Sequence, residues 1–197
     1  MYNTDIFKIE TNHVVPNQGK ILISEPFLYD HIFGRSVILL VDYTQDGAVG
    51  LVMNKPLPIL LNEIMDDFVD FQEEIPLYKG GPLSMDTLFY LHTFRQISGA
   101  IPVADGVYMN GTFDELKTCL KRGEHIEGNV RFFLGYSGWE YKQLDREINE
   151  NTWMVGEEDK ENLMDEKASS TMWKNAMSKL GGKYEMWARF PQIPIMN

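Results

Sequence analysis

The chain has 197 residues, of which 44% are hydrophobic, and its 29 acidic and 18 basic residues give a formal net charge of −11. This composition excludes a disordered chain, and the single cysteine, Cys119, excludes an intramolecular disulfide. The charge argues against direct binding to duplex DNA, because that binding needs clustered lysines and arginines to neutralise phosphates.

We expect a cytoplasmic protein that does not enter the membrane. The start of the chain is polar and mixed in charge, unlike a secretory signal. The longest strongly apolar run, residues 37–41, is far shorter than the roughly 20 residues of a membrane-spanning helix. The chain shows no linker, repeat or low-complexity tract. Residues 1–197 are therefore expected to form one domain, with residues 1–18 as an extended N-terminal arm.

The first predicted elements are strands. A short apolar strand follows Gly19, at residues 20–25. Residues 36–42, Ser-Val-Ile-Leu-Leu-Val-Asp, are typical of a strand that is buried on both faces. Asp46-Gly47 is a turn signal, and another apolar strand follows at residues 48–54. The last two strands are predicted to form a hairpin.

The rest of the chain alternates strands with helices. Apolar residues recur at helical spacing over residues 60–68. Residues 112–115, Thr-Phe-Asp-Glu, have the spacing of a capping box, which predicts a helix over residues 112–122. The other predicted elements are strands at residues 77–81, 88–93, 106–110 and 129–136, helices at residues 138–150 and 171–180, and a charged segment at 157–167 that is either a loose excursion or a helix with few core contacts. This irregular order predicts an α+β fold with a mixed sheet.

Ser137 lies where a strand meets a predicted helix. The sequence Gly135-Tyr136-Ser137-Gly138 departs from the nucleophile elbow Gly-x-Ser-x-Gly, because its second glycine comes one residue early. Ser137 and Glu140 instead have the Ser-x-x-Glu spacing of a capping box. We therefore expect Ser137 to cap a helix, and the free N–H groups of that helix could bind an anion weakly.

Other polar and glycine residues lie at the ends of predicted strands. The glycines of Gly47–Gly50 and Gly80-Gly81 match no nucleotide-binding fingerprint and are expected to allow tight turns. Asn54 is expected to bond to the backbone in a turn, with Lys55 as an anion contact. His92 ends a strand, and we expect it to be a hydrogen-bonded structural residue rather than a catalytic base.

Longer motifs occur along the chain in a fixed order. They are Leu-x-Asp-x-x-Phe-x-Arg-Ser-Val at residues 28–37, Gly-Ala-Val-Gly-Leu-Val-Met-Asn-Lys-Pro at 47–56, Lys-Gly-Gly-Pro at 79–82, Leu-His-Thr at 91–93, Leu-Gly-Tyr-Ser-Gly-Trp at 134–139 and Gln-Leu-Asp-Arg-Glu-Ile-Asn-Glu-Asn-Thr-Trp at 143–153. Together, over residues 19–182, they resemble the YqgE/AlgH family of bacterial proteins.

The resemblance implies a mixed, bifurcated β-sheet that is curled into a barrel-like core with flanking helices. It transfers no catalytic residue to this chain. It also brings a family label of transcriptional regulation. Relatives usually have glycine immediately before Gln143, whereas this chain has Lys142. This departure predicts that the position has no special backbone requirement.

Three interpretations of function remain open. We favour a non-catalytic cytoplasmic binding or regulatory protein that acts through a protein or small-molecule partner. The first alternative is an enzyme whose site is assembled from dispersed polar side chains, namely Asp30, Arg35, Asn54, His92 and Ser137. The second alternative is a transcriptional regulator, direct or indirect, of which the charge favours the indirect route through a protein partner.

A ligand site is predicted at the ends of the strands, where loops on a rigid scaffold supply function. Its candidate residues are Arg35, Asn54, Lys55, Gly80, Gly81, His92 and Ser137. No metal is predicted, because the four histidines are scattered along the chain. No catalytic residue or cofactor is predicted either, because the resemblance supplies none. The identity of the partner and the oligomeric state stay open at this point.

Overall fold

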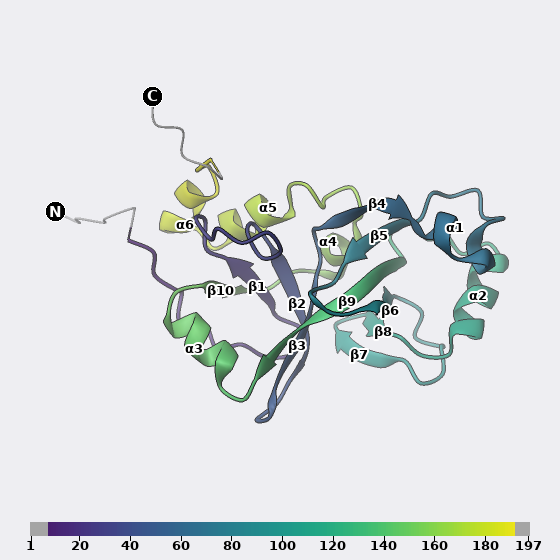
Figure 1. Ribbon diagram of the computed structural model, residues 1–197, viewed down its shortest axis with the longest axis horizontal. Helices are drawn as coiled ribbons and strands as arrows, with labels where there is room; N and C mark the ends of the chain where they lie inside the picture. Colours follow the sequence, from purple (N-terminus) through teal and green to yellow (C-terminus); the bar gives the residue numbers. More distant parts are fainter. Residues whose placement is uncertain (1–7, 192–197) are drawn as a thin grey trace.

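The computed structural model describes residues 8–191, so part of the predicted N-terminal arm lies outside the described residues. Ten strands join in one sheet (Figure 1). The strands are β1 (Ile21–Ser24), β2 (Val37–Tyr43), β3 (Gly47–Val52), β4 (Pro56–Leu60), β5 (Pro76–Lys79), β6 (Leu83–His92), β7 (Ile101–Ala104), β8 (Val107–Met109), β9 (Val130–Glu140) and β10 (Trp153–Gly156).

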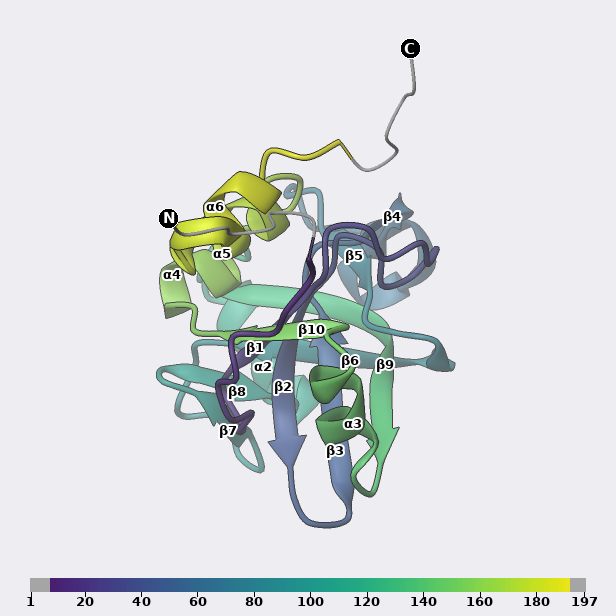
Figure 2. The same cartoon turned by 90° about the vertical axis from the view of Figure 1, so that its left-hand side faces the viewer.

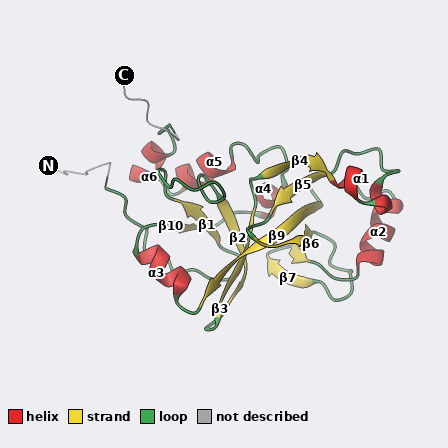
Figure 3. Ribbon diagram, viewed as in Figure 1, coloured by secondary structure: helices red, strands yellow, loops and turns green. Residues whose placement is uncertain are grey.

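The helices are short and flank the sheet (Figure 3). They are α1 (Leu61–Ile64), the 3-10 turn η1 (Asp66–Phe68), α2 (Phe113–Lys121), α3 (Gln143–Asn149), α4 (Lys160–Met164), α5 (Met172–Lys179) and α6 (Gly182–Trp187). Helix α5 packs on β1 and β2, and α3 packs where β3, β9 and β10 come together, as Figure 2 also shows.

Strand β9 crosses the centre of the molecule and divides the sheet (Figure 1). One edge of β9 pairs with β6 in antiparallel orientation. The other edge pairs first with β5 in parallel and then with β3 in antiparallel orientation. The sheet is therefore mixed and bifurcated. This confirms the α+β fold and the mixed sheet that the sequence predicted.

The main path of the sheet runs β10-β1-β2-β3-β9-β6-β8-β7. Within the described residues β10 and β7 end this path without pairing to each other. The sheet is thus not closed, and the barrel-like curl stays a prediction. The described part of the arm covers the edge of β10, where Asn12 accepts the N–H of Val155 at 3.1 Å and Nδ2 of the same side chain donates to the Val155 carbonyl at 2.6 Å.

Buried side chains form three clusters around the sheet. The first lies between the sheet and helices α4 to α6 and includes the buried Trp173 and Trp187. The second lies under α1 and α2 and is centred on Phe68 and Phe132. The third lies under α3 and contains Trp153. That the whole chain forms one domain stays a prediction.

Several predicted elements are confirmed. The hairpin of β2 and β3 is present, with Leu39 opposite Leu51. Helix α2 starts where the sequence placed it, with Thr112 at the N-cap, but its expected cap bond is absent. The Thr112 hydroxyl donates instead to the carbonyl of Ser98, and Glu115 accepts the N–H of Ser98. The predicted helix over residues 60–68 is divided into α1 and η1.

The prediction that Ser137 caps a helix is wrong. Residues 137–140 continue strand β9, because they pair with β3 and place Ser137 opposite Gly50. Helix α3 begins only at Gln143, whose Oε1 accepts the N–H of Glu140 at 3.0 Å. The backbone hydrogen bonds of the sheet thus override a local capping signal.

The charged segment at residues 157–167 is ordered rather than loose. It contains helix α4, which is capped by the Asp159 carboxylate accepting the N–H of Asn162 at 2.8 Å. Leu163 and Met164 of this helix are buried in the first cluster. In the described part of the chain, no helix is long and apolar enough to cross a membrane.

Candidate functional site

Three of the predicted site residues gather at the turn that precedes β2. Asn54 accepts the N–H of Val37 at 2.9 Å and donates to the carbonyl of Arg35 at 2.8 Å. Lys55 Nζ donates to the carbonyl of Gly34 at 2.6 Å, and burial lowers the pKa of Lys55. Asn54 and Lys55 therefore fasten the Gly34-Arg35 turn to the end of β3.

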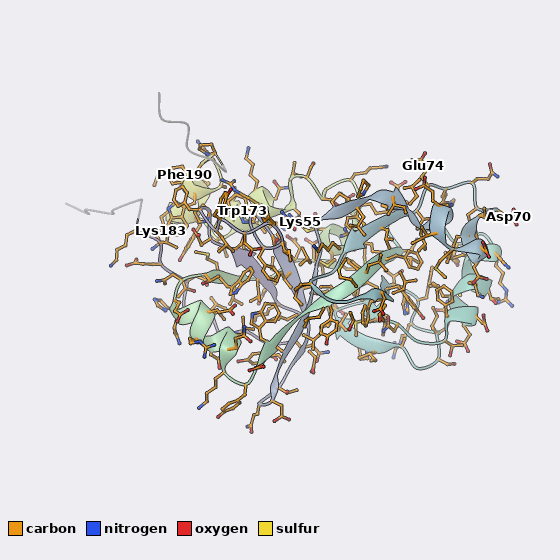
Figure 4. The ribbon with its side chains drawn as sticks, in the orientation of Figure 1. Lys55, Asp70, Glu74, Trp173, Lys183 and Phe190 are labelled. Carbon is orange, nitrogen blue, oxygen red and sulfur yellow. The ribbon has the colours of Figure 1, made fainter. Side chains whose placement is uncertain are left out.

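Arg35 links this turn to the C-terminal helices. Its backbone adopts the left-handed conformation, with φ of 56°. The guanidinium carbon lies 4.0 Å from the centre of the Trp173 ring, and Nη2 donates to the carbonyl of Phe190 at 2.6 Å. Figure 4 labels Trp173 and Phe190 in the same corner of the molecule. Burial lowers the pKa of Arg35, an effect that the charge of Glu25 opposes.

Gly80, Gly81 and Ser137 meet where β5 leaves β9. A Cβ on Gly81 would lie 2.2 Å from the carbonyl oxygen of Tyr136, and one on Gly80 would lie 2.2 Å from that of Gly135. The buried Ser137 hydroxyl donates to the carbonyl of Gly80 at 3.2 Å. These glycines therefore permit close backbone packing, and the Ser137 hydroxyl holds the same junction together.

His92 lies away from this turn, at the β8 end of β6. It is fully buried, and its ring stacks with Phe94 and Tyr108 at centroid distances of 6.2 and 5.9 Å. Nδ1 accepts the N–H of Phe94, so Nε2 carries the proton and donates to the carbonyl of Asn110 at 2.8 Å. Burial lowers the pKa of His92. Both ring nitrogens are thus committed to the backbone.

Four of the sequence motifs converge on one cleft of about 370 Å³, which we call the motif cleft. The motifs at residues 28–37, 79–82, 134–139 and 143–153 all contribute to it. The lining residues are Leu28, Asp30, Phe33, Pro82, Leu83, Gly138, Trp139, Gln143, Glu147, Thr152 and Trp153. Asp30, a candidate of the enzyme alternative, lines this cleft, whereas none of the seven predicted ligand-site residues does.

The floor of the motif cleft is organised by Glu147. Oε2 of this carboxylate accepts the indole N–H groups of Trp139 and Trp153, each at 2.8 Å. Oε1 accepts Nε2 of Gln143 at 2.8 Å. Because these donors come from β9, α3 and β10, the carboxylate joins three elements and fixes the position of its own negative charge.

Aromatic rings and a second carboxylate complete the motif cleft. The Trp139 and Trp153 rings meet edge to face, with centroids 6.2 Å apart, and Phe33 meets Trp153 in the same way at 5.7 Å. Asp30 Oδ1 accepts the N–H groups of Ile32 and Phe33 at 2.8 and 2.7 Å. Its other oxygen makes no hydrogen bond to any described residue, so it is available to a ligand.

A larger cleft, of about 570 Å³, lies at the tip of the β2–β3 hairpin. The Tyr43 hydroxyl donates to Asp145 across it at 2.9 Å. The lining residues are Tyr43, Thr44, Gln45, Gly47 and Ala48 of the hairpin and Glu140, Tyr141, Lys142, Leu144 and Asp145 before and within α3. Size alone does not identify a site. The smaller motif cleft brings together more separate motifs, and it has the more strongly organised polar groups.

Arg131, a charged residue that is 1% exposed, is a polar centre that was not predicted from the sequence. Its guanidinium donates to the carbonyls of Leu163 and Met53 at 2.8 and 2.6 Å and lies 4.2 Å from the centre of the Tyr78 ring. Burial lowers the pKa of Arg131. The signal in the sequence was an arginine within an otherwise apolar strand. Residues 8–191 contain no cluster of His, Cys, Asp and Glu that would hold a metal ion.

Comparison with known proteins gives one consistent result. A family model described as AlgH-like matches residues 21–185. A protein of Bacteroides fragilis, described as a UPF0301 protein, is 57% identical over 195 residues, which cover 99% of this chain and 98% of the relative. A UPF0301 protein of Bacteroides thetaiotaomicron is 55% identical with the same coverage.

Two solved structures share the fold. The crystal structure of a Corynebacterium diphtheriae protein superposes with a TM-score of 0.74 at 19% identity, over 96% of this chain and 100% of the other. The solution structure of the AlgH protein from Pseudomonas aeruginosa superposes with a TM-score of 0.64 at 26% identity, over 92% of this chain and 98% of the other.

Proposed function

The chain belongs to the AlgH-like family, and on that premise we propose that it is a non-catalytic binding protein whose motif cleft holds a cationic group of its ligand. The observation that carries the proposal is the convergence of four motifs on this cleft. Under this proposal the protein acts in the cytoplasm and as a single domain, as the sequence predicts.

The chemistry of the motif cleft favours a cation. Asp30 and Glu147 supply two carboxylates, and none of the described residues that line the cleft is a lysine, arginine or histidine. The charge of Asp30 acts on Lys55, which lies outside the cleft lining and donates to the carbonyl of Gly34. Aromatic faces and carboxylates together recognise ammonium and guanidinium groups, which are attracted to both. The net charge of −11 would also steer a cationic ligand toward the protein.

The placement of the other polar residues supports binding over catalysis. His92 and Ser137, the residues best suited to base or nucleophile chemistry, are buried and bonded to backbone carbonyls. Arg35 and Asn54 hold a turn, and Asp30 alone of the enzyme candidates lines the motif cleft. A role in transcription, under this proposal, would run through a protein partner.

The test is a titration with agmatine, which carries a guanidinium and an ammonium group on one butyl chain, followed by the indole N–H signals of Trp139 and Trp153 in NMR spectra. N-butylurea, which has the same chain length and no charge, is the uncharged ligand control. We expect saturable shifts of both indole signals with agmatine and none with the urea. Asp30→Asn keeps the turn acceptor but removes the charge, and it should weaken binding about tenfold, which corresponds to about 1.4 kcal/mol.

The control variant is Asp46→Asn, which removes an exposed charge from the hairpin turn and should leave the affinity unchanged. Equal binding of agmatine and the urea would show that the cleft binds ligands but would contradict the preference for a cationic group. Indole signals that stay fixed with every amine and guanidine tested would reject the proposal itself.

A further inference from the structure

The guanidinium of Arg35 offers two donors to a single acceptor. Nε–H and Nη2–H form one edge of the guanidinium and point in the same direction, a geometry that matches the two oxygens of a carboxylate or phosphate. Here Nη2 donates to the carbonyl of Phe190, while Nε is buried and has no hydrogen-bond partner among residues 8–191. A buried donor without a partner is costly, so this edge lacks a second oxygen.

The charges around Arg35 leave this edge without a carboxylate. Neither Arg35 nor Lys55 forms an ion pair within 4.0 Å of a described carboxylate, although the chain has 29 acidic residues. Glu25 affects Arg35 through its charge, but its Oε2 accepts the N–H of Phe27. Lys55 Nζ donates a hydrogen bond to the carbonyl of Gly34, the residue directly before Arg35. Among the described residues, the hydrogen bonds of both half-buried cations therefore go to backbone carbonyls, while Arg35 also lies on the Trp173 ring and the charge of Asp30 acts on Lys55.

The carbonyl that accepts the hydrogen bond from Arg35 belongs to Phe190, close to the C-terminal end of the described residues. Phe190 lies beyond residues 21–185, the part of the chain that the family model matches. Its ring stacks on Phe27, with centroids 5.6 Å apart, and its carbonyl supplies the one oxygen at Arg35. The segment around Phe190 thus covers a residue of the motif at 28–37.

We propose that the Nε–Nη2 edge of Arg35 is a binding site for a two-oxygen anion of the carboxylate or phosphate type, and that the Phe190 segment occupies and gates this site. An oxyanion would bond to both donors and would displace a neutral carbonyl that bonds to one. The site is separate from the motif cleft and does not depend on it.

The experiment uses the full chain and the side-chain Nε–H signal of Arg35 in ¹⁵N NMR spectra, assigned by its loss in Arg35→Lys. Inorganic phosphate and acetate are titrated separately at constant ionic strength, with chloride as the reference anion. We expect the Arg35 Nε–H signal to move with phosphate or acetate and not with chloride. The favoured anion is the one whose titration saturates the shift of the Arg35 signal at the lower anion concentration.

Two variants test the site and the gate. Arg35→Lys keeps the positive charge but lacks the paired donors, so the protein should lose saturable binding. Phe190→Ala removes the stack on Phe27, and it should tighten binding at least fivefold, because the competent state becomes more populated. Lys174→Gln removes an exposed cation next to Trp173 and should change nothing.

Each contrary outcome has a defined meaning. Shifts confined to other surface signals, or equal binding by Arg35→Lys, would show an adventitious ion only and would overturn the site. Unchanged affinity in Phe190→Ala, with the Arg35 signal still moving, would overturn the gate. Thermal unfolding of each variant checks that a loss of binding does not reflect a loss of fold.

Discussion

The indole N–H of Trp153 donates to the Glu147 carboxylate at 2.8 Å, and this bond fastens β10 to helix α3. The same oxygen also accepts the indole N–H of Trp139, from β9. A carboxylate presents two acceptor oxygens, whereas an amide presents one acceptor oxygen and one N–H₂ donor. Glu147 is therefore expected to contribute to stability as well as to the motif cleft.

Glu147→Gln should destabilise the protein by about 2 kcal/mol, because the new amide N–H₂ would face donors that have lost their acceptor. Urea unfolding monitored by tryptophan fluorescence gives the free energy of unfolding. The matched control is Glu150→Gln, an exposed residue at the C-terminal end of α3, for which we expect a change within about 0.5 kcal/mol. Equal effects in the two variants would contradict the role of Glu147.

Lys142→Gly should stabilise the protein by about 1 kcal/mol. Lys142 is the N-cap of α3 and has φ of 56°, a left-handed conformation that a side chain disfavours. The expectation that this position has no special backbone requirement is therefore wrong. Lys142→Ala, which removes the long side chain but keeps the strain, is the control and should give no gain. Urea midpoints of the three proteins check this, and a gain in the alanine variant would point to the side chain instead.

Glu166 should make stability fall between about pH 5 and pH 8. Burial raises the pKa of Glu166 to about 7 from 4.5, an effect that the charge of Arg131 opposes. Between these values the folded state holds a proton that the unfolded state releases, so the free energy of unfolding decreases as pH rises through the window.

The variant Glu166→Gln removes this titration. Relative to the parent it should gain stability from pH 5 to pH 8, on the order of 1 kcal/mol after allowance for partial exposure. Burial lowers the pKa of His92, which has the opposite effect on stability in an overlapping window but is present in both chains and cancels. Glu161→Gln, on the exposed side of α4, is the control. A difference that does not depend on pH would contradict the prediction.

The isolated protein should not bind duplex DNA with useful affinity. The net charge is −11, and the sequence contains no run of basic residues from which to build a phosphate track. Fluorescence anisotropy with random and promoter duplexes across a salt series tests this. Micromolar or tighter binding at about 150 mM salt, weakening steeply as salt rises, would contradict it.

Local signals predicted many of the elements. The apolar runs of β2 and β3 and the Asp46-Gly47 turn predicted the hairpin. The capping-box spacing predicted α2, and the periodic apolar pattern predicted α5. These signals lie within a few residues of one another. Strands β4, β7 and β10 and helix α6 were missed. They are short, and their place depends on neighbours that are distant in the chain.

The sequence by itself determined the family, the mixed α+β character and the location of its motifs. Only the tertiary structure decided which polar groups of those motifs remain available. Ser137 and His92 are bonded to carbonyls of other segments, so they are not available to a ligand. Glu147 and Asp30 line the same cleft, although nothing in the sequence predicted that these two residues would lie close together. The reason is physical: hydrogen-bond partners are chosen by strand pairing and packing across the whole chain, whereas the spacing of residues reports only on their neighbours.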